Sequence, residues 1–340
     1  MKIVQFIIAI LFFSNNFSVI ESHAFDYKIN LPGNLGGEFS KATAAKDNLK
    51  KDAICTRCHD ESENAPILSI YQTKHGVKGD ARTPSCQSCH GESESHVKGI
   101  VDPSTKIRKA PEVIFKKGTY SKSNDHIRAD QCLACHKGTN RNNWDGGAHQ
   151  VNGLACNDCH KVHVPQDPIL NKKTQTLTCF SCHPEQKADS HKISTHPIDV
   201  NKVVCSDCHN PHGTTGTKLL KKNTINEVCF SCHAEKRGPF LFEHQPVTEE
   251  CTNCHTPHGS NIAPLLKTRP PFLCQECHDG THASPTPAGR NVAGFQGGLA
   301  NTNRSGVAQF PSANLTGRAC MNCHVMVHGS NSPAGGFLQR

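Results

Sequence analysis

Apolar and aromatic side chains are scarce in this sequence of 340 residues. Only 35% of the residues are hydrophobic, and the chain has one Trp and three Tyr beside 26 Gly and 20 Pro. A globular chain of this length normally carries a larger apolar fraction. Its own side chains bury too little surface to offset the loss of chain entropy, so we expect a bound apolar group to replace the missing core.

Long apolar runs are also missing beyond the N-terminus. Lys2 precedes an apolar run over residues 3–13, and Ser22-His23-Ala24 places small residues before a cleavage point. This pattern predicts a secretory signal peptide over residues 1–24, followed by an N-terminal segment over residues 25–50. The run is too short to span a bilayer, although a retained amphipathic anchor is an alternative. We therefore expect a soluble chain that is exported to the periplasm.

No cysteine stands outside one motif. The pentad Cys-x-x-Cys-His occurs ten times and uses all 20 cysteines. This is the attachment signature of c-type haem, in which two thiols bind the porphyrin and the histidine binds iron. The predicted thioether cysteines are Cys55, Cys58, Cys86, Cys89, Cys132, Cys135, Cys156, Cys159, Cys179, Cys182, Cys205, Cys208, Cys229, Cys232, Cys251, Cys254, Cys274, Cys277, Cys320 and Cys323. The predicted proximal iron ligands are His59, His90, His136, His160, His183, His209, His233, His255, His278 and His324.

Three other chemistries use paired cysteines: zinc sites, disulfides and Cys-x-x-Cys redox centres. None of them requires a histidine after every second cysteine, and all ten pairs here have one. We therefore predict ten covalently attached haem c groups. The predicted fold class is a multihaem cytochrome c, elongated, with short helices at the pentads, irregular loops around the haems and very little β structure.

The pentads alternate between two kinds. Odd-numbered pentads are bare, whereas each even-numbered pentad has a histidine on either side. We predict these ten flanking histidines as distal ligands of the haem irons: His75, His96, His149, His163, His196, His212, His244, His258, His282 and His328. The array over residues 51–340 then divides into five two-haem repeats, over residues 55–131, 132–178, 179–228, 229–273 and 274–340.

Three histidines fall outside this count. His23 lies in the predicted signal peptide, and His126 and His191 break the repeat pattern, so we interpret the latter two as surface residues. Met326 is an alternative to His328 as an axial ligand of the last haem, since an axial thioether is common in monohaem cytochromes.

The positive net charge fits haem better than nucleic acid. The formal charge is +8, and each oxidised haem with two ionised propionates adds about one negative charge. Ten haems would cancel the basic excess, so the lysines are interpreted as propionate partners and solvated surface. No nucleic-acid partner is expected.

Two histidines at each iron would fill both axial positions. Such an iron changes oxidation state but binds no small reactant, which predicts an electron carrier rather than an enzyme. Bis-histidine ligation also favours a lower reduction potential than ligation by histidine and methionine.

Several stretches beyond the pentads are similar to a known family. They are Trp144–His149, Cys205–Gly213, Cys229–Pro239, Leu266–Arg269, Val327–Asn331 and Leu338–Arg340. Together they resemble the periplasmic decahaem cytochromes of the MtrA/DmsE/PioA family, which includes the iron-oxidation homologue MtoA. The resemblance covers nearly the whole chain after residue 51. The distal histidines of that family fall on the same ten positions that the repeat selects.

The resemblance implies a role at the outer membrane. Family members act as a wire inside an outer-membrane β-barrel porin. It connects a periplasmic or inner-membrane quinol-linked cytochrome to an outer-surface cytochrome or extracellular iron. We therefore expect the chain in the periplasm, associated with the outer membrane through a barrel partner. Electron flow inward from Fe(II) or outward to Fe(III) is open, with iron oxidation favoured by the N-terminal region and the short length.

Two other functions compete with the conduit. A free periplasmic electron shuttle or store would use the same ten haems without a barrel. A multihaem reductase would need an iron lacking a distal ligand or a modified pentad, and all ten pentads here end in histidine.

Overall fold

The described part of the chain covers most of the predicted array. The computed structural model describes residues 50–60, 67–77, 82–278, 320–333 and 337–338, with the backbone of two short strands between 301 and 309. The predicted signal peptide over residues 1–24, nearly all of the segment over residues 25–50, and His282 lie outside the described residues.

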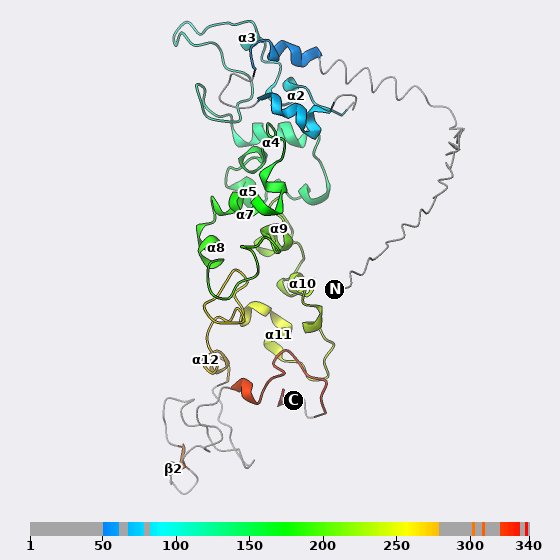
Figure 1. The fold of residues 1–340 in the computed structure, drawn as a ribbon, viewed down its shortest axis with the longest axis vertical. Coiled ribbons are helices and arrows are strands. Elements are labelled where there is room, and N and C mark those ends of the chain that lie inside the picture. The colour runs from blue at the N-terminus through cyan, green and yellow to red at the C-terminus, as the bar shows by residue number, and fades with distance from the viewer. Residues whose placement is uncertain are drawn as a thin grey trace, which may run out of the picture.

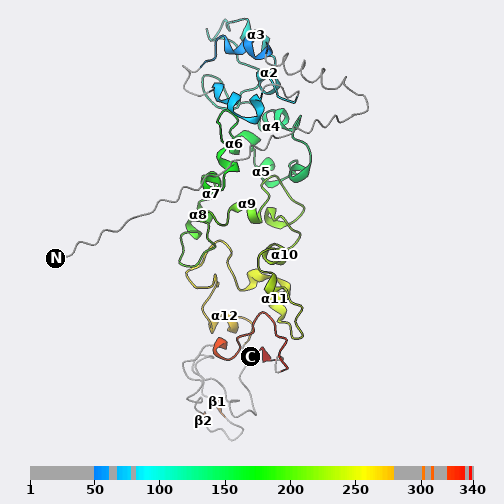
Figure 2. The same ribbon diagram turned by 45° about the vertical axis from the view of Figure 1, so that its right-hand side comes forward.

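The molecule is elongated, and its elements follow one another along the long axis in chain order (Figures 1 and 2). The helices α2 (Cys86–His90) and α3 (Glu94–Val97) lie at one end, and α12 (Phe272–Gln275) lies toward the other. This order confirms the predicted elongated array of short helices and irregular loops.

No helix in the described residues is long, because glycine, proline and the pentads interrupt the chain. The other α-helices are α4 (Asp125–Leu133), α5 (Ala148–Val151), α6 (Cys156–Cys159), α7 (Lys172–Phe180), α8 (Pro184–Asp189), α9 (Cys205–Cys208), α10 (Ile225–Phe230) and α11 (Gln245–Glu249). The 3-10 helices are η1 (Ile67–Gln72), η2 (Lys74–Gly76), η3 (Thr139–Arg141), η4 (Pro168–Leu170), η5 (Thr217–Leu219), η6 (Ala234–Lys236), η7 (Cys251–Asn253) and η8 (Cys320–Asn322). The strands β1 (Asn301–Thr302) and β2 (Ala308–Gln309) pair antiparallel and confirm that β structure is minor.

Side chains alone form almost no core. The apolar residues buried within the described ranges are Val113, Ala129, Trp144, Ala155, Val204, Leu220 and Leu266. The largest fully buried side chain there is a charged one, Arg128. The scarcity of apolar residues in the sequence therefore persists as a scarcity of apolar packing.

The two kinds of pentad occupy opposite ends of their helices. Odd-numbered pentads begin near the C-terminal end of a helix, as Cys132 does in α4, Cys179 in α7 and Cys229 in α10. Side chains at the other end cap these helices: the Asn124 and Asn171 side chains accept hydrogen bonds from backbone N–H groups at the start of α4 and α7. Such caps satisfy donors that have no partner inside the helix.

Even-numbered pentads begin at the N-terminal end of a short helix. In the second, fourth and sixth pentads the second variable residue folds back onto the backbone N–H before the first cysteine, as the Asp158 carboxylate does on Ala155 at 2.8 Å. The Asp207 carboxylate does the same on Val204 at 2.9 Å. This side chain satisfies an N–H at the helix start, so it fixes the entry to the pentad.

Candidate haem-binding sites

Each pentad closes one helical turn. In nine pentads the histidine N–H donates to the carbonyl of the first cysteine, at 2.8 to 3.1 Å, and the tenth forms α2. Residues three and four positions apart lie on the same face of a helical turn. Both thiols and the imidazole therefore project to one side, as attachment to one porphyrin requires.

The cysteines are available for attachment. All twenty are free thiols, and none forms a disulfide. Within one repeat the first cysteines of the two pentads are neighbours. The hydrogen bond between the Cys132 and Cys156 thiols raises the pKa of Cys132 and lowers that of Cys156 to about 7. The same relation joins Cys179 to Cys205 and Cys229 to Cys251.

Consecutive repeats also meet through their cysteines. Burial raises the pKa of Cys89 and Cys208, and a cysteine of the next repeat, Cys135 or Cys229, raises it further. Neighbouring pentads in the sequence are therefore neighbours in space. The attachment points form a single ordered series along the molecule.

Nine predicted proximal histidines each face one predicted distal histidine. The pairs, with the distance between ring centroids, are His59–His96 (6.1 Å), His90–His163 (6.4 Å), His136–His75 (5.9 Å), His160–His212 (6.0 Å), His183–His149 (6.1 Å), His209–His258 (6.0 Å), His233–His196 (6.4 Å), His255–His328 (6.2 Å) and His278–His244 (6.2 Å). The predicted distal histidine that these nine pairs do not use is His282, which lies outside the described residues.

The spacing of these pairs fits a haem iron between the rings. A metal–imidazole bond is about 2 Å long and the ring centroid lies about 1 Å beyond the nitrogen, so two imidazoles on opposite sides of one ion have centroids roughly 6 Å apart. The measured distances of 5.9 to 6.4 Å agree with this value. The donor set of two thiols and two imidazoles therefore fits c-type haem at nine pentads.

Most pairs join different repeats. The histidine of an even-numbered pentad faces the histidine that follows the next even-numbered pentad, as His160 faces His212. An odd-numbered pentad from the third onward takes the histidine that precedes the even-numbered pentad before it, as His183 takes His149. Each predicted repeat therefore places predicted ligand histidines against histidines of its neighbours.

A glycine directly after each of three distal histidines lies close to the preceding repeat, against backbone at Gly213 and Gly259 and against the Phe240 ring at Gly329. Gly213, Gly259 and Gly329 directly follow His212, His258 and His328, and their φ angles are 102°, 150° and 132°. A Cβ on Gly213 would lie 1.9 Å from the backbone oxygen of Asn143, and one on Gly259 would lie 1.9 Å from that of Asp189. Only glycine allows this approach and this conformation.

The same junctions orient the other set of distal histidines. His149, His196 and His244 donate from Nδ1 to the carbonyls of Pro211, Pro257 and Val327, at 2.8, 2.8 and 2.9 Å. Each acceptor residue directly precedes a distal histidine of the next repeat. A hydrogen bond at Nδ1 leaves Nε2 to bind metal and fixes the ring orientation.

Burial keeps several distal imidazoles neutral. Burial, together with the positive charges of His160 and Arg141, lowers the pKa of His212 to about 4. Burial likewise lowers the pKa of His75, His258 and His328. Because metals bind the neutral imidazole, these side chains are held in the form that ligates iron.

A polar side chain joins the two pentads within each of the first four repeats. It lies three or four positions before the first cysteine of the odd-numbered pentad and bonds to the start of the even-numbered one. Asp52 accepts from the Cys86 N–H at 2.7 Å, Gln175 from the Ser206 N–H at 3.1 Å and Asn226 from the Cys251 N–H at 2.7 Å. In the second repeat Arg128 has this place.

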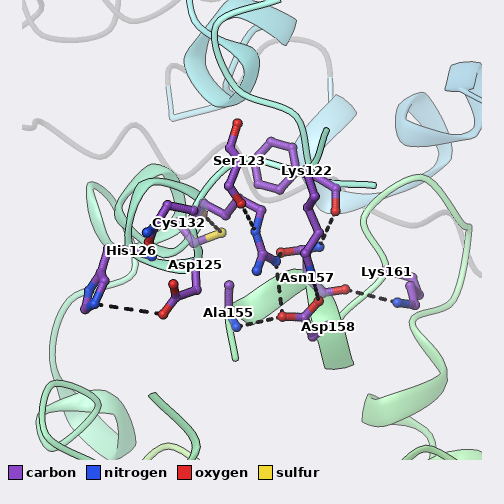
Figure 3. A network of polar contacts seen from close by, with 12 residues as sticks. Lys122, Ser123, Asp125, His126, Cys132, Ala155, Asn157, Asp158 and Lys161 are labelled. Carbon is purple, nitrogen blue, oxygen red and sulfur yellow. Dashed lines mark hydrogen bonds and ion pairs between the residues drawn. The ribbon is translucent and has the colours of Figure 1, made fainter. Parts of the chain in front are cut away.

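Arg128 is 1% exposed, and its partners Ser123, Asn157 and Asp158 are labelled in Figure 3. It donates to Asn157 Oδ1 at 2.5 Å, to Asp158 Oδ2 at 3.1 Å and to the carbonyl of Ser123 at 2.9 Å. Lys122 Nζ contacts the other oxygen of Asp158 at 3.2 Å. A buried guanidinium with this many acceptors is stable only while all of them remain in place.

Sequence reasoning missed these four joining residues. The signal was present, because a residue three or four positions before a cysteine lies on the same helix face. His126 and His191, which we interpreted as surface residues, are exposed. His328, for which Met326 was the alternative ligand, faces His255 of the eighth pentad. No helix among the described residues is long and apolar enough to cross a membrane.

Comparison with known proteins agrees with this geometry. A family model described as the doubled CXXCH motif matches residues 196–238 and 244–283, and one described as cytochrome c-type protein NrfB-like matches residues 86–176. The protein named multiheme cytochrome MtrA from Shewanella baltica (strain OS185) is 42% identical over 292 residues, which cover 84% of this chain and 80% of that protein. The chain therefore belongs to the MtrA family of multihaem c-type cytochromes, which are electron-transport proteins.

Proposed function

We propose that this chain conducts electrons along ten c-type haems, each attached through two cysteines of a pentad and ligated by two histidines. The pairing of nine proximal with nine distal histidines at 5.9 to 6.4 Å carries this proposal. The remaining predicted ligands, His282 and His324, are assigned to each other as the tenth pair. The array functions as five two-haem repeats with the boundaries predicted from the sequence.

In this proposal the protein holds and the haem reacts. Haem supplies an iron that changes oxidation state and an apolar surface that replaces the missing core. The cysteines fix each group to the chain, and the paired histidines close both axial positions. The hydrogen bonds at Nδ1 set ring orientation, and the glycine junctions set the distance between repeats.

The closed axial positions favour an electron carrier over a multihaem reductase. Activation of a small substrate at iron needs an open coordination position. Nine proximal histidines each have a predicted distal histidine opposite them, with ring centroids 5.9 to 6.4 Å apart. The proposal therefore assigns no catalytic residue.

We further propose that the chain forms a conduit across the outer membrane with a β-barrel partner. Its likeness to the Shewanella protein and its elongated body, with pentads in sequence order, support this step. One end would meet a periplasmic or inner-membrane quinol-linked cytochrome, and the other an outer-surface cytochrome or extracellular Fe(II) or Fe(III). The direction of electron flow would depend on the electron donors and acceptors available at the two ends.

The ligation proposal is tested on the purified holoprotein. Intact mass and pyridine haemochrome absorbance should give ten haems per chain, and EPR should show low-spin ferric iron throughout. A lower haem count or a substantial high-spin population would overturn it.

The conduit proposal is tested in liposomes that contain the chain and its candidate barrel. A reductant outside should bleach a redox dye inside, and exchanging the two compartments should give transfer in the other direction. Transfer that does not depend on the barrel, or a chain that never copurifies with it, would favour the free periplasmic shuttle.

A further inference from the structure

Proximal histidines of the even-numbered pentads all bond through Nδ1 to an acceptor that follows them in the chain. Four of these acceptors are backbone carbonyls: His90 bonds to Val113 O at 3.1 Å, His209 to Lys218 O at 2.8 Å, His255 to Pro264 O at 2.9 Å and His324 to Phe337 O at 2.5 Å. The fifth, His160, bonds to a carboxylate oxygen, Asp167 Oδ2, at 2.6 Å. One pentad thus has a charged acceptor where its four counterparts have a neutral one.

Loop length explains the exchange. In two of the other repeats the acceptor carbonyl lies nine residues after the histidine, at Lys218 and Pro264. Asp167 lies only seven residues after His160. The shorter loop brings a side chain, rather than a backbone carbonyl, to the Nδ1 position.

The carboxylate is held in place from its other side. Asp167 Oδ1 accepts from the backbone N–H groups of Lys161 at 3.2 Å and Ile169 at 3.3 Å, which makes Asp167 the N-cap of η4. Oδ2 then points at His160, and the side chains of Asp167 and His160 are 13% and 29% exposed. Partial burial and two backbone bonds preserve the orientation of the carboxylate and limit solvent screening.

The charge of Asp167 is not shared with a lysine or arginine in the described ion pairs. The neighbouring carboxylate of Asp158 is paired with Arg128 and Lys122. The ion-pair partner of Asp167 in the described residues is His160. Its negative charge is therefore directed at the imidazole.

We propose that Asp167 tunes the iron ligated by His160, giving it a lower reduction potential than it would have with a neutral acceptor. A carboxylate that accepts the Nδ1 proton makes the imidazole a stronger donor at Nε2 and so stabilises ferric over ferrous iron. The inference rests on the proposed ligation of haem at the pentad over residues 156–160. Its consequence is a position in the first half of the array that is harder to reduce than it would be with a neutral acceptor.

The test is Asp167→Asn in the full-length holoprotein, followed by potentiometric titration with visible and EPR detection. Asn keeps the N-cap through Oδ1 but places an NH2 group where Oδ2 accepted, so it removes both the charge and the acceptor at His160 Nδ1. About one tenth of the reductive absorbance change, corresponding to one of ten irons, should move to higher potential. One low-spin EPR signal should shift with it, while haem content stays at the wild-type value.

Two matched variants separate the hydrogen bond from charge alone. Glu235 Oε1 lies 3.7 Å from His233 Nδ1, and its side chain is 60% exposed. Since this separation exceeds hydrogen-bond distance, Glu235→Gln should give a smaller shift. Asp102 accepts from the N–H groups of Ser104 and Thr105, so Asp102→Asn should leave all potentials unchanged.

If Asp167→Asn leaves the potentials unchanged, or shifts them no more than Glu235→Gln does, the tuning role is overturned. Ten low-spin haems in that variant would still uphold the proposed function. A wild-type protein without haem on Cys156 and Cys159 would overturn both.

Discussion

The regular repeats after residue 132 and the first repeat hold their histidines by different means. In the regular part, a distal histidine such as His149 donates to the backbone of the next repeat. In the first repeat, the distal His96 donates instead to Lys109 O of its own repeat at 2.8 Å, while the proximal His90 donates to Val113 O at 3.1 Å, within its own repeat as its counterparts do. Both acceptors lie in the segment over residues 98–122, which the later repeats lack.

This segment is braced by its own contacts. Arg108 donates to the carbonyls of His96 at 2.6 Å and Val97 at 3.2 Å, and the Tyr120 hydroxyl donates to Arg108 O at 2.8 Å. Ser93 and Glu112 exchange hydrogen bonds at 3.1 and 3.0 Å. The first repeat has no preceding repeat to pack on. The segment over residues 98–122 therefore acts as a terminal cap, as atypical end repeats do in other arrays.

The largest effect is expected at the joint between these two regions. Arg128→Met removes the buried guanidinium that links Ser123, Asn157 and Asp158. We expect a loss of about 3–5 kcal/mol in unfolding free energy, because the carboxylate of Asp158 loses its buried partner. Guanidinium unfolding followed by circular dichroism measures this loss. Lys122→Ala removes only the more exposed partner of Asp158 and should cost less than about 1 kcal/mol; equal losses would contradict this account of the joint.

The second-largest effect is expected at a glycine junction between two regular repeats. Gly213→Ala places a Cβ against Asn143 O at a residue with φ of 102°, which should cost about 1–3 kcal/mol. Because His212 is displaced from His160, one iron should become high-spin in the EPR spectrum. A Cβ on Gly118 would meet no atom within 4 Å, so Gly118→Ala is the control and should leave the spectrum unchanged. A fully low-spin Gly213→Ala protein would show that the junction does not position the ligand.

The cap over the first repeat should respond more weakly. Arg108→Ala removes two hydrogen bonds to backbone carbonyls near His96, for an expected loss of about 1–2 kcal/mol. The EPR signal of the iron between His59 and His96 should change, and the other signals should stay. Changes spread over many signals would mean that the segment supports the whole array rather than its end.

The smallest effect is expected at an exposed ion pair in the same repeat. Lys98 and Glu94 are 62% and 73% exposed, so Lys98→Ala should change the unfolding free energy by less than about 0.5 kcal/mol. A loss comparable to that of Arg108→Ala would indicate that surface charge, not backbone bracing, stabilises the cap. Guanidinium unfolding of both variants decides this point.

Local motifs explain how much of the site could be predicted. Each pentad spans five residues and closes one helical turn, so its thiols and imidazole share a face whatever surrounds them. The alternation of bare and flanked pentads likewise singled out nine histidines that each face a pentad histidine in the structure. The joining residues Arg128 and Asn226 and the acceptor Asp167 were missed, because polar residues of these types are common on surfaces and only their neighbours reveal a role.

The sequence by itself determined the scarcity of core and the membership of a multihaem family, and it predicted the cofactor class and the attachment residues, since all of these follow from residue type and short spacing. The tertiary structure decided which histidine faces which. His160 and His212 are 52 residues apart (212 − 160), and their meeting depends on the backbone contact between Gly213 and Asn143 in two different repeats. Ligand pairing is a long-range property because neighbouring repeats, not neighbouring residues, bring the two imidazoles together.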